Sequence, residues 1–213
     1  MNTLIELTRD SLLGVVVHLA PRFGSVLLFV LIGRQGGPGE AGVFGLATTY
    51  LVISTTLFRG LDDLVTRQVS REPDEAAPYL SSFLLLRIGL VSAFYGLLAW
   101  VVRVAFDYPR STTVPVLIVA ASLIPDSVAY VTQAVLLGRQ QFAPPAITIG
   151  IANLVKVAAG GWLLVRGADL QDVAWAWTIG SVLGMLLLLI VVFREIRPSG
   201  WSAWLDWRPV TTH

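Results

Sequence analysis

Several charged side chains interrupt long apolar runs of this sequence. They are Arg22, Arg59, Asp62, Asp126 and Lys156. Ionised groups inside apolar segments are costly, and they usually face a cavity, a partner or a ligand. The planar fork of an arginine pairs well with phosphate oxygens, and a lysine supplies a compact positive charge. We therefore predict an anion-binding role for Arg22, Arg59 and Lys156. Asp62 and Asp126 are predicted either to couple an ion or a proton, or to pair structurally with a buried cation.

The residue types that build most catalytic and metal centres are scarce here. Cysteine is absent, and the only two histidines are His18 and His213. The sequence contains no cluster of metal ligands and no pairing of a nucleophile with a base. We therefore expect neither an enzyme nor a bound cofactor or metal. The net charge of +1 gives no basic signal for nucleic acid.

The composition is that of an integral membrane protein. Hydrophobic residues make up 55% of the 213 positions, and the mean hydropathy is +0.73. Charged residues make up 14%, against about 25% in a typical soluble domain. Long apolar runs must cross a bilayer as helices, because lipid cannot satisfy the backbone hydrogen bonds of other structures. The predicted fold class is all-α, with membrane lipids as the surroundings.

Six apolar segments have the length of about 20 residues that a membrane crossing needs. We predict transmembrane helices at residues 12–32, 41–70, 79–104, 114–137, 143–165 and 173–193, forming one lobe over residues 1–195. Residues 196–213 carry Trp201, Trp204 and Trp207, and tryptophan favours the membrane interface. This tail is expected to be an interfacial helix or a linker to a further lobe.

The placement of arginines gives the predicted orientation. With the N-terminus inside, the inner segments hold Arg9, Arg67, Arg71, Arg139, Arg194, Arg197 and Arg208. The outer segments hold Arg34, Arg103, Arg110 and Arg166. Because basic residues concentrate on the cytoplasmic side, both termini are expected in the cytoplasm.

Helical spacing groups some of these charges. His18 lies one turn before Arg22 and shares its face, so His18 is a candidate helper of that arginine. Asp126 and Lys156 either pair with each other or act as independent groups, and their spacing does not separate these alternatives. Arg87, near the start of its helix, is expected to snorkel to the headgroups. A stripe of small residues at Gly180 and its helical neighbours predicts close helix packing.

Residues 33–44 read GRQGGPGEAGVF, and such a glycine-rich run could in principle surround a phosphate. A phosphate loop needs a preceding strand and a GK[ST] or spaced glycine pattern, and neither is present. We therefore predict that this run forms the tight outer hairpin between the first two helices.

The same run carries a resemblance to a known family. It is similar to the motif that follows the first helix of bacterial polysaccharide flippases, which export O-antigen-type oligosaccharides and belong to the multidrug/oligosaccharidyl-lipid/polysaccharide flippase superfamily. The matching residues are Arg34, Gly37, Pro38, Gly42 and Phe44, whereas Gly36 and Ala41 depart from the pattern. The runs GLDDLVTRQVSRE, LLLRIGL and QAVLLGRQQF also resemble family segments, in the same order.

The resemblance implies the N-terminal half of such a flippase, in the bacterial cytoplasmic membrane. It implies alternating access around a central cationic cavity, and a substrate of the undecaprenyl-pyrophosphate-linked oligosaccharide type used in polysaccharide biosynthesis. By position it implies that Arg22 and Arg59 meet the pyrophosphate, whereas the role of Lys156 follows from its own spacing and depth. Family members have two lobes, so the partner is expected to be a second half, in the same chain or another.

Two alternatives remain open at this stage. A multidrug cation antiporter of the same superfamily would need carboxylates such as Asp126 to dominate its binding site. A non-transporting membrane scaffold of a polysaccharide assembly complex would need none of the charged residues for transport.

Overall fold

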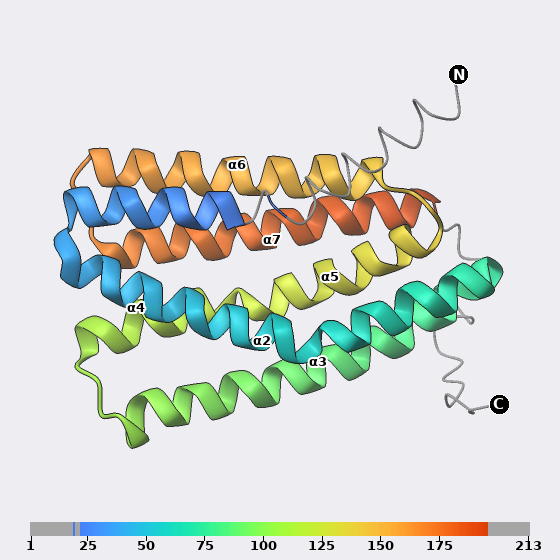
Figure 1. Cartoon of the computed structure of the whole chain (residues 1–213), viewed down its shortest axis with the longest axis horizontal. Coiled ribbons are helices and arrows are strands. Elements are labelled where there is room, and N and C mark those ends of the chain that lie inside the picture. The colour runs from blue at the N-terminus through green and yellow to red at the C-terminus, as the bar shows by residue number, and fades with distance from the viewer. Residues whose placement is uncertain (1–18, 20–21, 196–213) are drawn as a thin grey trace.

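The computed structural model describes Leu19 and residues 22–195 (Figure 1). After a first helix at residues 22–35, the elements are α2 (Gly37–Arg71), the 3-10 turn η1 (Pro73–Glu75), α3 (Ala76–Trp100), the π-helical turn η2 (Val101–Ala105), α4 (Arg110–Ala121), α5 (Leu123–Gly138), α6 (Ala143–Val165) and α7 (Leu170–Glu195). No strand occurs in these residues, so the predicted all-α fold is confirmed. His18 and the tryptophan-containing tail lie outside the described residues.

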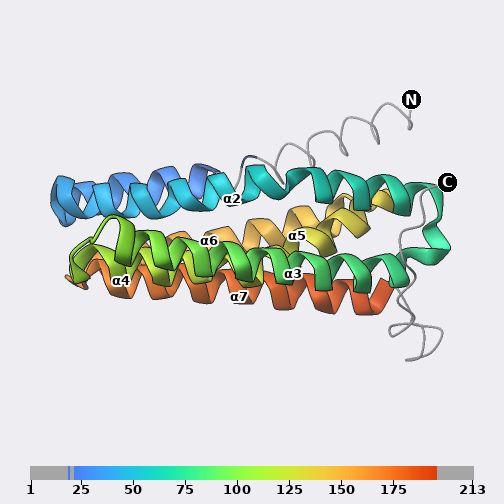
Figure 2. The same ribbon diagram turned by 90° about the horizontal axis from the view of Figure 1, so that it is seen from below.

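Within the described residues, five helical segments are long and apolar enough to cross a membrane. They are Gly37–Arg71, Pro73–Ala105, Arg110–Gly138, Ala143–Val165 and Leu170–Arg194. Their lengths and compositions are those of a multi-pass membrane protein. The helices run roughly along one common axis, as two perpendicular views show (Figure 2).

The turn between the first helix and α2 is shorter than predicted. The first helix runs through residue 35, Gly36 alone forms the turn, and α2 begins at Gly37. Gly37 has a backbone φ of +83°, which residues with a side chain rarely adopt. Pro38 follows in the first turn of α2, where its fixed φ and missing N–H suit a helix start. The glycines of this run therefore allow two helices to meet with almost no loop.

The fourth predicted span is divided into two helices. α4 ends at Ala121 and α5 begins at Leu123, with Ser122 between them. Pro125 explains the break, because it has no N–H to donate and its ring collides with the carbonyl four residues earlier. That carbonyl belongs to Ala121, the last residue of α4. At the break the Ser122 N–H instead donates to the Val119 carbonyl, 3.0 Å away.

The packing of the helices determines which faces are internal. α2 packs against α4 and α5, α3 packs against α5, and α7 packs against α4, α5 and α6. The first helix lies on α6, where a Cβ atom added at Gly160 would be 2.8 Å from Leu28 Cδ2. A Cβ atom added at Gly184 of α7 would be 3.0 Å from Ala152 Cβ of α6. Small residues thus allow close approach of helix backbones, as the stripe on α7 predicts.

Two clusters of buried apolar side chains form the core, and α2, α3, α5 and α7 each contribute to both. The first cluster contains Leu28, Ile32, Ala41, Phe44, Ala47, Leu51, Phe58, Val91, Leu98, Val102, Val116, Val119, Ala120, Leu123, Leu164, Leu170, Val173, Ala174 and Trp177. The second cluster contains Val65, Val69, Ala76, Ala77, Leu80, Phe83, Val131, Ala134, Val135, Leu136, Leu188 and Val192. The buried core is therefore divided along the length of the bundle.

Gly138→Ala is expected to destabilise the contact between α5 and α2 by about 1–3 kcal/mol, because the site has no room for a methyl group. An added Cβ would lie 2.8 Å from Val69 Cβ and 2.9 Å from the Thr66 carbonyl oxygen, so the backbone must move. The matched control is Gly150→Ala in α6, where an added Cβ meets nothing within 4 Å. Denaturation of both variants in detergent measures the difference, and an equal loss of stability would contradict the prediction.

Candidate buried polar site

Charged and polar side chains separate the two apolar clusters. In α2, Asp62 lies between Phe58 and Val65 along the chain. In α3, Arg87 lies between Phe83 and Val91. In α5, Asp126 and Tyr130 lie between Leu123 and Val131. In each of these helices the two apolar residues that flank the polar ones belong to different clusters. The polar belt, as we call it, consists of Asp62, Arg87, Asp126, Tyr130 and Lys156.

Arg87 of α3 forms a buried ion pair with Asp62 of α2. Its Nη1 atom lies 2.9 Å from Asp62 Oδ1, and the exposed fractions of the two side chains are 3% and 23%. The same nitrogen donates to the Phe58 carbonyl at 2.7 Å, and the guanidinium carbon lies 5.2 Å from the centre of the Phe58 ring. The expectation that Arg87 snorkels is wrong, because the neighbouring α2 supplies both a carboxylate and a carbonyl at its level.

Tyr130 of α5 joins this ion pair to the next one. The guanidinium carbon of Arg87 lies 6.0 Å from the centre of the Tyr130 ring. Asp126 precedes Tyr130 by one helical turn, so both residues lie on the same face of α5. The belt therefore continues from α2 and α3 across α5.

Lys156 of α6 and Asp126 of α5 form the second buried pair. Lys156 Nζ lies 3.7 Å from Asp126 Oδ1, and the exposed fractions of the side chains are 10% and 21%. The ammonium also lies 4.8 Å from the centre of the Trp177 ring of α7, a cation–π distance. Gly180 makes this position possible, because an added Cβ there would collide with Lys156 Cγ. The structure thus brings together the two residues whose pairing the sequence left open.

Some buried polar atoms of this region have no hydrogen-bond partner among the described residues. They are Arg87 Nε, Ser122 Oγ, Trp177 Nε1 and Ser181 Oγ. Such atoms are uncommon in protein interiors, and each leaves a donor or acceptor unsatisfied. Neither Trp177 nor Ser181 was a candidate from the sequence. A tryptophan at helical spacing from small residues is typical of ordinary core packing.

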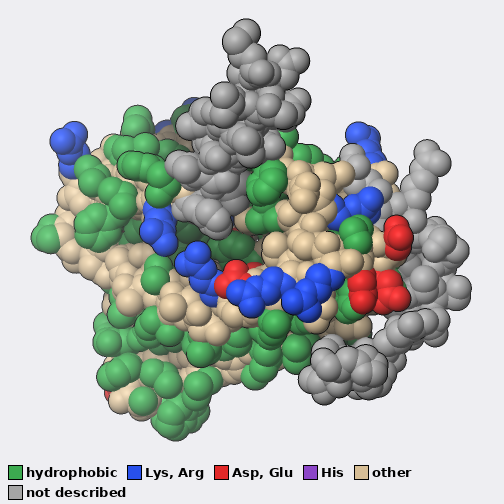
Figure 3. Space-filling model, turned by 45° about the vertical axis from the view of Figure 1, so that its right-hand side comes forward, with side chains coloured by type: hydrophobic (Ala, Val, Ile, Leu, Met, Phe, Trp, Pro, Cys, Tyr) green, Lys and Arg blue, Asp and Glu red, His purple; other side chains and the backbone are tan. Residues whose placement is uncertain are grey.

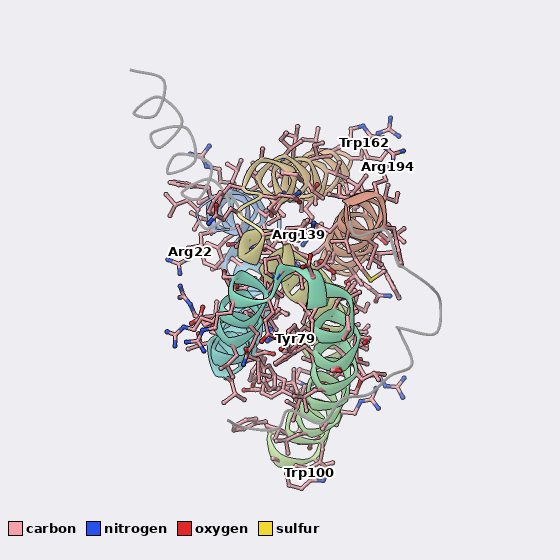
Figure 4. The ribbon with its side chains drawn as sticks, turned by 90° about the vertical axis from the view of Figure 1, so that its right-hand side faces the viewer. Arg22, Tyr79, Trp100, Arg139, Trp162 and Arg194 are labelled. Atoms are coloured by element: carbon pink, nitrogen blue, oxygen red, sulfur yellow. The ribbon has the colours of Figure 1, made fainter. Side chains whose placement is uncertain are left out.

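Arg22 and Arg59, which are predicted to bind an anion, are both exposed. Arg22 points away from the bundle (Figure 4). Arg59 lies on an exposed strip of α2 together with Asp63 and Arg67, each one turn further along. Figure 3 shows such a row of basic side chains, with an acidic one among them, across one face of the molecule. The structure therefore does not bring either arginine together with Lys156 inside the bundle.

A register signal in the sequence could have found the Asp62–Arg87 pair. In an antiparallel hairpin, residues equally distant from the turn lie opposite each other. Asp62 and Arg87 are separated by 25 positions, and the midpoint of this interval falls within the turn Pro73–Glu75. The distance of Arg87 from the turn therefore indicates its partner on α2, whereas its depth in its own helix does not.

The described residues contain no group of three or more histidine, aspartate or glutamate side chains that could hold a metal ion. The chemistry available inside the bundle is therefore that of two charge pairs, a phenol, an indole and hydroxyl groups. On the outer surface, basic side chains such as Arg22 and Arg59 are exposed. Comparison with known proteins identifies no relative, since no family model, curated protein or solved structure matches the chain.

Proposed function

We propose that this bundle is one lobe of a transporter that moves an anionic, lipid-linked oligosaccharide across the bacterial cytoplasmic membrane. The observation that carries the proposal is the contrast between its two sets of charges. Buried Arg87 and Lys156 are each close to a carboxylate, whereas Arg22 and Arg59 are exposed. Among the described residues, Arg22 and Arg59 are therefore cations that a substrate could reach from the outside of the lobe.

The depth at which the two exposed arginines would lie in the membrane agrees with a lipid-linked substrate. From Gly37 to Arg59, α2 rises by about 33 Å, and from Arg22 to residue 35 the first helix rises by about 20 Å. The hydrocarbon core is about 30 Å thick. If both helices reach the surface at Gly36, Arg59 lies at the headgroups of the opposite leaflet and Arg22 lies within that leaflet.

Because the distribution of arginines in the sequence predicts cytoplasmic termini, the leaflet that lies opposite the Gly36 turn is the cytoplasmic one in this proposal. A pyrophosphate-linked lipid carries its anionic headgroup at that level before transport. Arginine forks bind phosphate oxygens through charge-assisted hydrogen bonds. Both arginines lie outside the bundle, so a phosphate bound there would be enclosed between this lobe and a second one. Lys156 belongs to the proposal as a cation that becomes available when its pair with Asp126 opens.

The double variant Arg22→Ala/Arg59→Ala is expected to reduce translocation of lipid-linked oligosaccharide by about tenfold or more, since two charge-assisted contacts are lost. The measurement compares lipid-linked glycan in the two leaflets of cells that contain the full chain and its partners. The control is Arg34→Ala/Arg166→Ala, which also removes two exposed arginines, one near the end of the first helix and one directly after α6. The control is expected to translocate normally.

Membrane insertion of each variant is checked by its amount in the membrane fraction. Normal translocation by the Arg22→Ala/Arg59→Ala variant would contradict the proposed phosphate site. If deletion of the whole chain stops export while that variant still exports normally, the chain is a scaffold. Uptake of a cationic dye that depends on Asp126 would instead favour a cation antiporter.

A further inference from the structure

The surroundings of Lys156 contain more hydrogen-bond donors than the protein satisfies. An ammonium has three N–H donors, and the indole Nε1–H of Trp177 is a donor only. Asp126 Oδ1 is 3.7 Å from Lys156 Nζ, which is beyond the usual length of about 2.7–2.9 Å for a charge-assisted hydrogen bond. Trp177 Nε1 has no partner among the described residues, although the ammonium lies against the Trp177 ring.

Two hydroxyl groups without partners approach the same region. Thr178 of α7 donates to the Ile118 carbonyl of α4 at 2.7 Å, which fixes the register of the two helices. α4 and α7 run in the same direction, so Ser122 and Ser181, about one turn further along, come to a similar level. Their Oγ atoms are buried and lack partners among the described residues.

Ser122 and Ser181 are also connected to the ion pair through the chain. The Asp126 N–H donates to the Ser122 carbonyl at 2.9 Å, so Ser122 lies one turn before the carboxylate. Ser181 follows Gly180, the residue over which the stem of Lys156 passes. It lies one turn after Trp177, on the same face of α7. Ser122, Trp177 and Ser181 therefore lie at levels of their helices close to the place where α5, α6 and α7 meet around Lys156.

We propose that this junction is an internal water-binding site that bridges Lys156 and Asp126. One water molecule can contact two groups 3.7 Å apart, accepting from the ammonium and donating to the carboxylate. It can also accept from Trp177 Nε1–H or exchange hydrogen bonds with the hydroxyl groups. Buried waters typically make about three such bonds to groups that the protein leaves unsatisfied.

Water fits this site better than an ion does. The Lys156–Asp126 pair is neutral as a whole, so a bound anion or cation would leave a net charge buried in the bundle. An uncompensated charge in a low-dielectric interior is costly, whereas a water molecule adds none. The inference concerns hydration of the pair, and it holds whether or not the chain transports a lipid-linked substrate.

X-ray hydroxyl-radical footprinting of the full chain in lipid nanodiscs tests the site, because radicals made from water oxidise only side chains close to that water. Trp177 is buried, yet its oxidation rate is expected to come within about tenfold of that of exposed Trp162. The double variant Lys156→Met/Asp126→Leu replaces the polar partners with apolar side chains of similar size. It is expected to lower Trp177 oxidation by about fivefold or more relative to Trp162.

The matched control is Asp62→Leu/Arg87→Met, the same exchange at the other buried pair. It is expected to leave Trp177 oxidation within about twofold of the unmodified chain. Size-exclusion chromatography and circular dichroism confirm that both variants are folded. Absence of Trp177 oxidation in the unmodified chain would overturn the proposal without any variant. Unchanged Trp177 oxidation in the folded Lys156→Met/Asp126→Leu variant would also overturn it.

Discussion

Arg87→Ala is expected to lower the free energy of unfolding of the bundle by about 3–5 kcal/mol, because it leaves the Asp62 carboxylate without its cation in a partly buried position. The guanidinium lies 2.9 Å from Asp62 and 2.7 Å from the Phe58 carbonyl, and its side chain is 3% exposed. The variant therefore also removes a hydrogen bond between α3 and α2. Unfolding in mixed detergent and SDS, followed by circular dichroism, measures the loss.

Two further variants separate the ion pair from the bulk of the side chain. Asp62→Leu/Arg87→Met removes both charges and keeps much of the volume, so it is expected to recover most of the lost stability. Arg59→Ala removes an exposed arginine from the same region and is expected to leave stability nearly unchanged. If Arg87→Ala were no more destabilising than Arg59→Ala, the buried pair would not hold α2 to α3.

Phe44→Ala is expected to lower stability by about 3–5 kcal/mol, the usual range for removing a buried phenylalanine side chain. Phe44 of α2 is 1% exposed, and its ring meets the Trp177 ring of α7 edge to face at 5.6 Å between centroids. Helices in a bilayer associate largely through such packing, because lipid tails are as apolar as the side chains. The cavity left by alanine lies between α2 and α7, so the packing of the Phe44 ring against Trp177 is lost.

Phe23→Ala is the matched control for the packing prediction. Phe23 is 70% exposed on the first helix, so lipid or detergent can fill the space that its ring leaves. The free energy of unfolding of the Phe23→Ala variant is expected to stay close to that of the unmodified chain in the same SDS titration. Similar losses for the Phe44 and Phe23 variants would mean that the first cluster contributes little to holding the helices together.

Most of the fold could be predicted from the apolar runs, because the bilayer fixes the minimum length of a crossing helix. The prediction for residues 143–165 coincides with α6. The structure departs from the predicted helix bounds at two prolines. Pro125 divides the fourth span, although the hydropathy there is continuous, and Pro38 allows α2 to begin directly after the turn.

The candidate site was less predictable, because helical spacing shows which residues share a face but not which face is internal. Asp126 and Lys156 are on different helices, and only the packing of α5 against α6 and α7 brings them together. The outward position of Arg22 likewise depends on where its neighbours pack. Whether these arginines bind a substrate stays a prediction.

The short turn between α2 and α3 has a consequence for which changes in the chain can be tolerated. Pro73 and Asp74 are exposed, so their identities can vary at little cost. Their number is a different matter. If one added residue joins α3, every later side chain of that helix turns by about 100° around its axis. Arg87 would then face away from Asp62, although neither residue had been replaced. In this segment a substitution is a small change and an insertion is a large one.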